Sequence, residues 1–184
     1  MIYLDNAATT LYKPRAVEQA VRRAMYGAAG YARGSYAAAG RAGELVYACR
    51  EQAAALFGVG EPERVIFTLN ATHALNIAIN ALVKLDSRVI VSGYEHNAVM
   101  RPLTARNIEP TVLDTPLWDG AAMISALKQA LVQGADLMIL SHVSNVFGYI
   151  LPVEQLAEMC RKWRVPFIID AAQSAGALPV DLQA

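Results

Sequence analysis

The sequence predicts an α/β fold with a wound, mostly parallel β-sheet and helices on both of its faces. Segments with apolar residues at helical spacing alternate along the chain with short runs that are apolar throughout. Such runs are typical of strands that are buried on both faces, as in parallel sheets covered by helices. From about Arg64 onward the order is strand then helix, repeated.

Five segments carry apolar residues three and four positions apart, which is the pattern of an amphipathic helix. They are 17–25, 46–57, 75–83, 124–131 and 153–160. Pro14 and Pro152 suit the first turns of the first and last helix, because a proline there removes no helical hydrogen bond. Asp119 is placed to cap the helix that follows it.

The predicted strands are 65–67, 89–91, 137–140 and 167–169, with 111–113 as a weaker candidate. The two helices that precede the first strand do not fit the repeated unit. They are joined by the glycine-rich segment GAAGYARGSYAAAG, which we expect to form a mobile loop.

Composition narrows the class of protein. The 184 residues suit one domain, and 55% hydrophobic residues exclude a disordered chain. Sixteen basic residues balance sixteen acidic ones, so no excess of positive charge points to nucleic acid. No apolar run approaches the ~18 residues of a membrane helix, and the N-terminus does not resemble a signal peptide. Two cysteines make no disulfide framework, so we expect a cytoplasmic protein.

Polar residues follow the predicted strands where each one ends. Parallel strands place their carboxyl ends at one edge of the sheet, where ligands bind in open α/β folds. The chain's three histidines, His73, His96 and His142, fall at such ends, together with Asp170. The sequence therefore predicts the functional site at this edge.

Each polar group allows more than one interpretation. Ala71 and Thr72 open a helix and could hold a phosphate, although an ordinary helix cap has the same composition. Asp170 ends a buried strand and needs a partner, either a protonated ring nitrogen or a structural arginine. His96 could stack on a planar ligand or transfer a proton, or it could be a packed histidine.

The remaining candidates are less specific. Asn145 and Gln173 could orient ring or carboxylate oxygens or fix a loop, and His142 is expected to be structural. Cys49 and Cys160 fall on apolar helix faces and are expected to be small core residues. A weaker hypothesis makes carboxylate clamps of two arginines beside the glycine-rich loop, Arg33 and Arg41.

Five motifs resemble those of one enzyme family and occur in the same order as in that family. They are YLDNAATT, FTLNATHALNIAI, EHNAV, SHVSNVFG and IIDAAQSAGALPVDL, which together extend from Tyr3 to Leu182. The sequence resembles the cysteine desulfurases, in the class V aminotransferase group of fold-type-I pyridoxal-phosphate enzymes. The resemblance implies pyridoxal 5'-phosphate as cofactor and the large domain of these transferases as fold.

The resemblance also implies roles for individual residues. Ala71 and Thr72 resemble the turn that binds the cofactor phosphate. His96 resembles the histidine that stacks on the pyridine ring and takes part in proton transfer, and so is the expected catalytic residue. Asp170 resembles the aspartate that keeps the ring nitrogen protonated.

Two amides complete the implied cofactor site. Gln173 resembles the residue that donates to the phenolic oxygen, and Asn145 the asparagine near both the ring and the substrate carboxylate. The segment 32–35 (ARGS) resembles a dimer-interface loop of the family.

The chain departs from the family pattern in what it lacks. The family's Schiff-base lysine, sulfur-accepting cysteine and small domain would follow Ala184. The lysines of this chain fall away from the strand ends; they are Lys13, Lys84, Lys128 and Lys162. We therefore expect an N-terminal arm, 1–13, and a truncated large cofactor-binding domain, 14–184, that is inactive by itself.

The expected function of the complete protein is conversion of L-cysteine to alanine with transfer of sulfur to an enzyme persulfide. A homodimer and a sulfur-acceptor protein are the implied partners. Selenocysteine lyase or aminotransferase activity, or a noncatalytic truncated partner protein, are the alternatives. A zinc site built from the three histidines is a further hypothesis, although their spacing matches no zinc motif.

Overall fold

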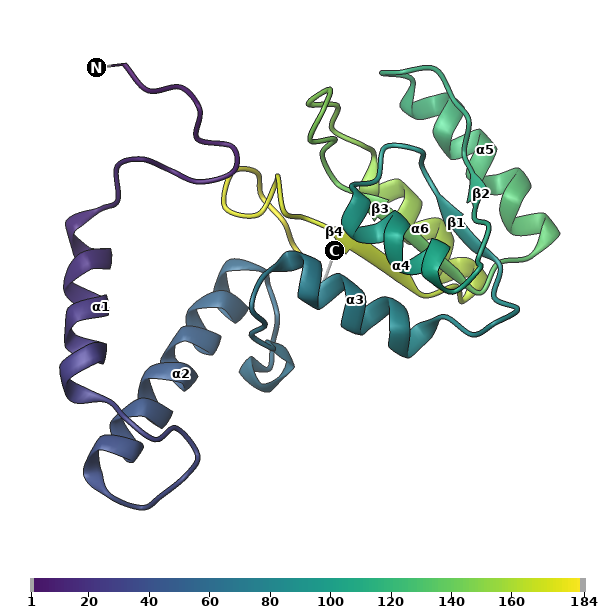
Figure 1. The fold of residues 1–184 in the computed structure, drawn as a ribbon. Helices are drawn as coiled ribbons and strands as arrows, with labels where there is room; N and C mark the ends of the chain where they lie inside the picture. The colour runs from purple at the N-terminus through teal and green to yellow at the C-terminus, as the bar shows by residue number, and fades with distance from the viewer. Residues whose placement is uncertain (1, 183–184) are drawn as a thin grey trace. The chain divides into compact units, whose positions relative to one another are not determined.

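The computed structural model describes residues 2–182, which divide into two compact units (Figure 1). Unit 1 contains residues 2–66 and 180–182, and unit 2 contains residues 67–179. Within the described residues, no helix has both the length and the apolar character needed to cross a membrane. The division into an arm and a cofactor-binding domain stays a prediction.

Unit 2 is built on a parallel sheet of four strands. The strands are β1 (Val89–Val91), β2 (Thr111–Val112), β3 (Leu137–Ser141) and β4 (Phe167–Asp170), and their order in the sheet is β2-β1-β3-β4. The predicted strands 89–91, 137–140 and 167–169 are confirmed, and so is the weaker one at 111–113. The predicted α/β class with a parallel sheet is thereby confirmed.

Two hydrophobic cores cover the two faces of this sheet. The helices of unit 2 are α3 (Ala71–Leu82), α4 (Asn97–Ala105), α5 (Gly120–Gln133) and α6 (Val153–Trp163) (Figure 1). Leu137 and Ile139 of β3 pack in one core with residues of α3 and α4, whereas Met138 and Leu140 pack in the other with α5 and α6. Alternate residues of a strand face opposite sides, so a fully buried strand needs helices on both.

The helix boundaries follow from local chemistry. The Asp119 carboxylate accepts the Ala122 N–H at 2.8 Å and caps α5, as predicted. Pro14 and Pro152 stand at the N-cap positions of their helices and not in the first turns. Helix α4 is not predicted from the sequence, because Pro102 inside it removes one helical hydrogen bond. Its burial stabilises it nonetheless: Val99, Pro102 and Leu103 are all buried at helical spacing.

Unit 1 is helical. It contains α1 (Arg15–Gly27), α2 (Ala37–Leu56) and the 3₁₀ turn η1 (Pro62–Arg64). The loop between the two helices is shorter than the predicted 27–40, because α2 starts at Ala37. The Arg41 guanidinium donates to the Gly27 carbonyl at 2.6 Å and ties the two helices together. Helix α1 buries none of its residues.

The predicted strand at 65–67 is wrong. These residues form neither helix nor strand, and Ile66 and Phe67 are exposed. A strand requires a hydrogen-bonded neighbour, and none of the strands within residues 2–182 pairs with this run. Apolar composition alone therefore misassigned it.

The two cysteines differ in environment. Cys160 is a core residue, as predicted, with its Sγ 3.5 Å from the Met138 sulfur, whereas Cys49 is exposed and its predicted burial is wrong. Helix α2 buries only three alanines, so its apolar face has little to pack against. Burial raises the pKa of the Cys160 thiol to about 11, which keeps it protonated at neutral pH.

This difference predicts one reactive thiol in the folded chain. At pH 8 a disulfide reagent should modify Cys49 within minutes, while Cys160 should react only as fast as the protein unfolds. Thiol counting by absorbance should give one group before denaturation and two after it. The Cys49→Ser variant should show none before denaturation; rapid modification of Cys160 in that variant would contradict the assignment.

Candidate functional site

A pocket of about 140 Å³ lies where β3 and β4 end, on the face of the sheet that α3 and α4 cover. The structure brings all six residues of the predicted cofactor site to this pocket. They are Ala71, Thr72, His96, Asn145, Asp170 and Gln173. Leu75, Ala98, Ser141, Val143 and Ala172 complete its lining.

The start of α3 provides hydrogen-bond donors. The Asn70 carboxamide oxygen accepts the His73 N–H at 2.9 Å and so acts as the helix cap. Within the described residues, the N–H groups of Ala71 and Thr72 and the Thr72 hydroxyl have no hydrogen-bond acceptor. Unpaired donors at the positive end of a helix dipole favour an anion. Because Asn70 is the cap, Thr72 remains available to a ligand.

The turn between β1 and α4 is held by a carboxylate that the sequence did not single out. Glu95 accepts from the Ser92 N–H at 3.0 Å, from the Gly93 N–H at 2.8 Å and from the Ser92 hydroxyl. Gly93 has φ +87, a conformation that a side chain would strain. This closed turn ends at His96.

His96 begins α4 as its N-cap. Its Nδ1 accepts the Ala98 N–H at 3.1 Å, so the neutral ring carries its proton on Nε2. The ring therefore has a fixed orientation and lines the pocket with Thr72 and Asp170. The sequence does hold a signal for this turn: Ser92 and Glu95 flank a glycine directly before His96.

Asp170 ends β4, opposite Ser141 of β3, and is nine-tenths buried. Its Oδ1 accepts the Ala172 N–H at 3.0 Å. Among the described residues it forms no ion pair, so the structural arginine that the sequence left open does not exist in this part of the chain. A buried carboxylate with a free oxygen is suited to a cationic ligand group.

Asn145 and Gln173 are exposed at the pocket and come from two turns. The buried Ser144 hydroxyl organises the first turn by accepting the N–H groups of Val146 and Phe147. Gln173 lies in the turn after β4, in which the Ala171 carbonyl accepts the N–H of Ser174 at 3.0 Å. These internal bonds hold both turns independently of any ligand.

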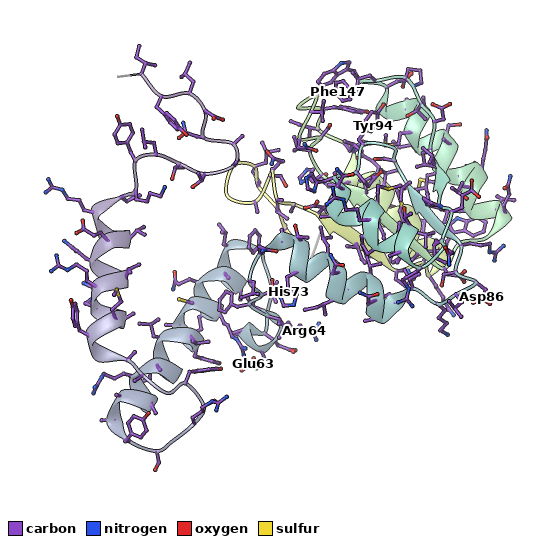
Figure 2. All side chains as sticks on the ribbon, viewed as in Figure 1. Glu63, Arg64, His73, Asp86, Tyr94 and Phe147 are labelled. Atoms are coloured by element: carbon purple, nitrogen blue, oxygen red, sulfur yellow. The ribbon has the colours of Figure 1, made fainter. Side chains whose placement is uncertain are left out.

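Aromatic contacts join the turn of His96 to the turn of Asn145. The Tyr94 ring lies edge-on to Phe147, with centroids 6.2 Å apart, and edge-on to Tyr149 at 5.6 Å. Figure 2 shows Tyr94 and Phe147 close together in unit 2. Perpendicular ring pairs of this kind are favourable beyond the area that they bury.

The other sequence candidates lie elsewhere. His73 and His142 do not line the pocket, and no group of three metal-ligating side chains gathers among residues 2–182. Burial lowers the pKa of His142, and its Nδ1 is buried without a hydrogen-bond partner in the described structure. Arg33 and Arg41 belong to unit 1, where Arg41 bonds Gly27.

The Glu95 turn yields a testable prediction. Glu95→Ala should lower the free energy of unfolding by about 2 kcal/mol, because buried donors of Ser92 lose their acceptor. Urea unfolding followed by circular dichroism measures this. The matched control Glu109→Ala, at an exposed position of the same unit, should change it by less than about 0.5 kcal/mol. Equal effects of the two substitutions would show that the turn contributes nothing.

The chain is similar to known cysteine desulfurases. The chain is 38% identical over 191 residues to the cysteine desulfurase IscS of Shewanella loihica, covering 99% of this chain and 47% of that protein. The apo structure of a cysteine desulfurase from Thermococcus onnurineus NA1 has a TM-score of 0.87 at 26% identity, covering 99% and 46% of the two chains. A C-DES mutant with glycine covalently linked to its PLP cofactor has a TM-score of 0.67 at 25% identity, covering 82% and 41%.

The chain spans about half the length of the curated relatives that it matches. The aminotransferase class-V family matches residues 2–184, which is nearly the entire sequence. The predicted resemblance is therefore confirmed at the level of the family: the chain belongs to the class V aminotransferases.

Proposed function

We propose that this chain supplies the cofactor-binding part of a cysteine desulfurase that depends on pyridoxal 5'-phosphate. The complete reaction converts L-cysteine and an enzyme thiol to alanine and an enzyme persulfide. The similarity to IscS and to the desulfurase structure supports this substrate. The observation that carries the proposal is the pocket itself, in which an unpaired carboxylate, a fixed imidazole and free helix N–H donors meet.

The donor set fits pyridoxal 5'-phosphate. Its phosphate matches the free N–H groups of Ala71 and Thr72 and the Thr72 hydroxyl at the α3 N-terminus. Its ring nitrogen, when protonated, matches the free oxygen of Asp170, which no cation of the described chain neutralises. When bound, the cofactor supplies an electron sink that stabilises negative charge on the substrate carbon.

The chain's own residues would orient the cofactor and the substrate and would polarise the cofactor ring. Asp170 holds a proton on the ring nitrogen, and Gln173 donates to the phenolic oxygen. His96 packs on the ring and moves protons through Nε2, since Nδ1 is occupied by the Ala98 N–H. Asn145 contacts the ring and the substrate carboxylate.

Partners follow from the same proposal. The relatives named cysteine desulfurase support cysteine as substrate. A homodimer with the 32–35 segment at its interface, a sulfur-acceptor protein and a cytoplasmic location complete the proposal.

A noncatalytic role for the 184-residue chain itself is the second candidate. None of the residues that line the pocket in the described structure is a lysine. A lysine amine is required for covalent attachment of the cofactor. The chain by itself should therefore hold the cofactor without covalent chemistry.

Binding tests the proposed function directly. Calorimetric titration with pyridoxine 5'-phosphate, which has no aldehyde, should show one site per chain. Asp170→Asn should weaken the affinity about tenfold, because the ring cation loses its charged partner. The control Asp114→Asn, at an exposed aspartate of the same unit, should leave it unchanged. Absence of saturable binding to the unmodified chain would remove the proposal.

Reduction tests the absence of covalent attachment. The chain is incubated with pyridoxal 5'-phosphate, treated with borohydride and digested, and the lysine adducts are quantified by mass spectrometry. Scattered, substoichiometric adducts that excess pyridoxine 5'-phosphate does not suppress are expected. One stoichiometric adduct that the competitor removes would place a reactive lysine at the pocket.

A further inference from the structure

A second cavity of about 350 Å³ adjoins the cofactor pocket between α3 and α4. Thr72, His96 and Ala98 line both cavities, so the two cavities adjoin at these residues. The remaining lining comes from Asn76 of α3 and from a short stretch of α4 that includes Arg101. Nothing in the proposed cofactor site accounts for this arginine.

Helix geometry places Arg101 on the same face of α4 as Ala98, which lines both cavities. Ala98 and Arg101 are three residues apart on α4, and Thr72 and Asn76 are four apart on α3. Residues at these spacings lie on one face of a helix, so each helix presents one such face to the cavity. The Asn76 amide donates to the Thr72 carbonyl at 2.8 Å, which holds this face at the first turn of α3.

The Arg101 guanidinium has no ion pair and no hydrogen bond within the described residues. Arg106, the C-cap of α4, differs: it donates to the Asn80 side chain at 2.8 Å and to the Val83 carbonyl at 2.7 Å. Arg106 therefore has a structural role in joining α3 and α4. Arg101 thus carries a positive charge with no protein counter-ion in the described chain, beside the α3 N-terminus that is proposed to bind the phosphate.

The cofactor pocket, in contrast, lacks positive charge. Among the described residues that line it, Asp170 is the one acidic side chain, and none is a lysine or an arginine. A bound phosphate adds a charge of about −1.5 to −2. The protonated ring balances Asp170, and the α3 N-terminus contributes only about +0.5. The described residues that line this pocket therefore leave about one negative charge of the phosphate unbalanced near Thr72.

We propose that Arg101 balances this charge and is a phosphate-binding residue of the site, reaching the anion at the α3 N-terminus through the second cavity. This proposal rests on the proposed function, since it requires a phosphorylated ligand beside Thr72. It predicts that Arg101 recognises the phosphate and not the ring.

The experiment compares two ligands that differ only in the phosphate. Pyridoxine 5'-phosphate and pyridoxine are titrated into the full chain by calorimetry, into Arg101→Gln and into Arg23→Gln, an exposed arginine of α1 as control. Arg101→Gln should bind pyridoxine 5'-phosphate about tenfold or more weakly, as expected for loss of a charge-assisted hydrogen bond. Its affinity for pyridoxine should equal that of the unmodified chain, and Arg23→Gln should change neither value.

Two further measurements separate the outcomes. Arg101→Lys should recover part of the affinity, because it restores the charge without the planar fork of donors. Inorganic phosphate should compete with pyridoxine 5'-phosphate for the unmodified chain and weakly for Arg101→Gln. If the unmodified chain binds the phosphorylated ligand and Arg101→Gln binds it equally well, the proposal is wrong while the proposed function stands. Equal weakening of both ligands would also overturn it, and no binding by the unmodified chain would remove both proposals.

Discussion

The parallel pairing of β3 with β4 is the constraint on which the site depends. Its register places Ser141 opposite Asp170 at the carboxyl ends of the two strands. Ile139 and Ile168, two residues earlier, face the core that contains α3 and α4. Because side chains alternate along a strand, Ser141 and Asp170 must face the same side, where the first turns of α3 and α4 begin. A slip of one residue would turn the Asp170 carboxylate toward α5 and α6, away from Thr72 and His96.

The elements around this sheet fix the pocket before any ligand is present. Glu95, Ser144 and Asn70 each bond N–H groups of their own turn, and each turn ends at or beside a pocket residue. Several groups that line the cavity, in contrast, have no protein partner in the described chain, namely the first N–H donors of α3 and one oxygen of Asp170. Local hydrogen bonds thus hold the turns around the pocket and leave the ligand-facing groups free. The pocket is therefore preorganised for a ligand.

Most of the sheet and the members of the pocket could be predicted from the sequence, because both follow from short-range patterns. Asp170 and His96 follow apolar runs, and parallel pairing brings such positions to one edge. Pairing itself is not local, which is why 65–67 was misassigned: its apolar residues have no strand beside them in the described chain. Helix α4 was missed because Pro102 argues against a helix locally, whereas its buried ring stabilises the helix through tertiary packing. Cys49 shows the same limit, since an apolar helix face is buried only if another element covers it.

Helix α1 has thirteen residues and buries none of them, although valines and a methionine recur along one side of it. An isolated helix of this length is marginal in water, because nucleation is unfavourable and few hydrogen bonds offset it. Its backbone amides should therefore sample the coil and exchange with deuterium far sooner than those of β3, which lie beneath two layers of side chains. The sheet and the first helix thus differ in the kind of order they possess: side chains from both faces hold the sheet, whereas α1 is held by its own turns and by the hydrogen bond from Arg41 to its last residue.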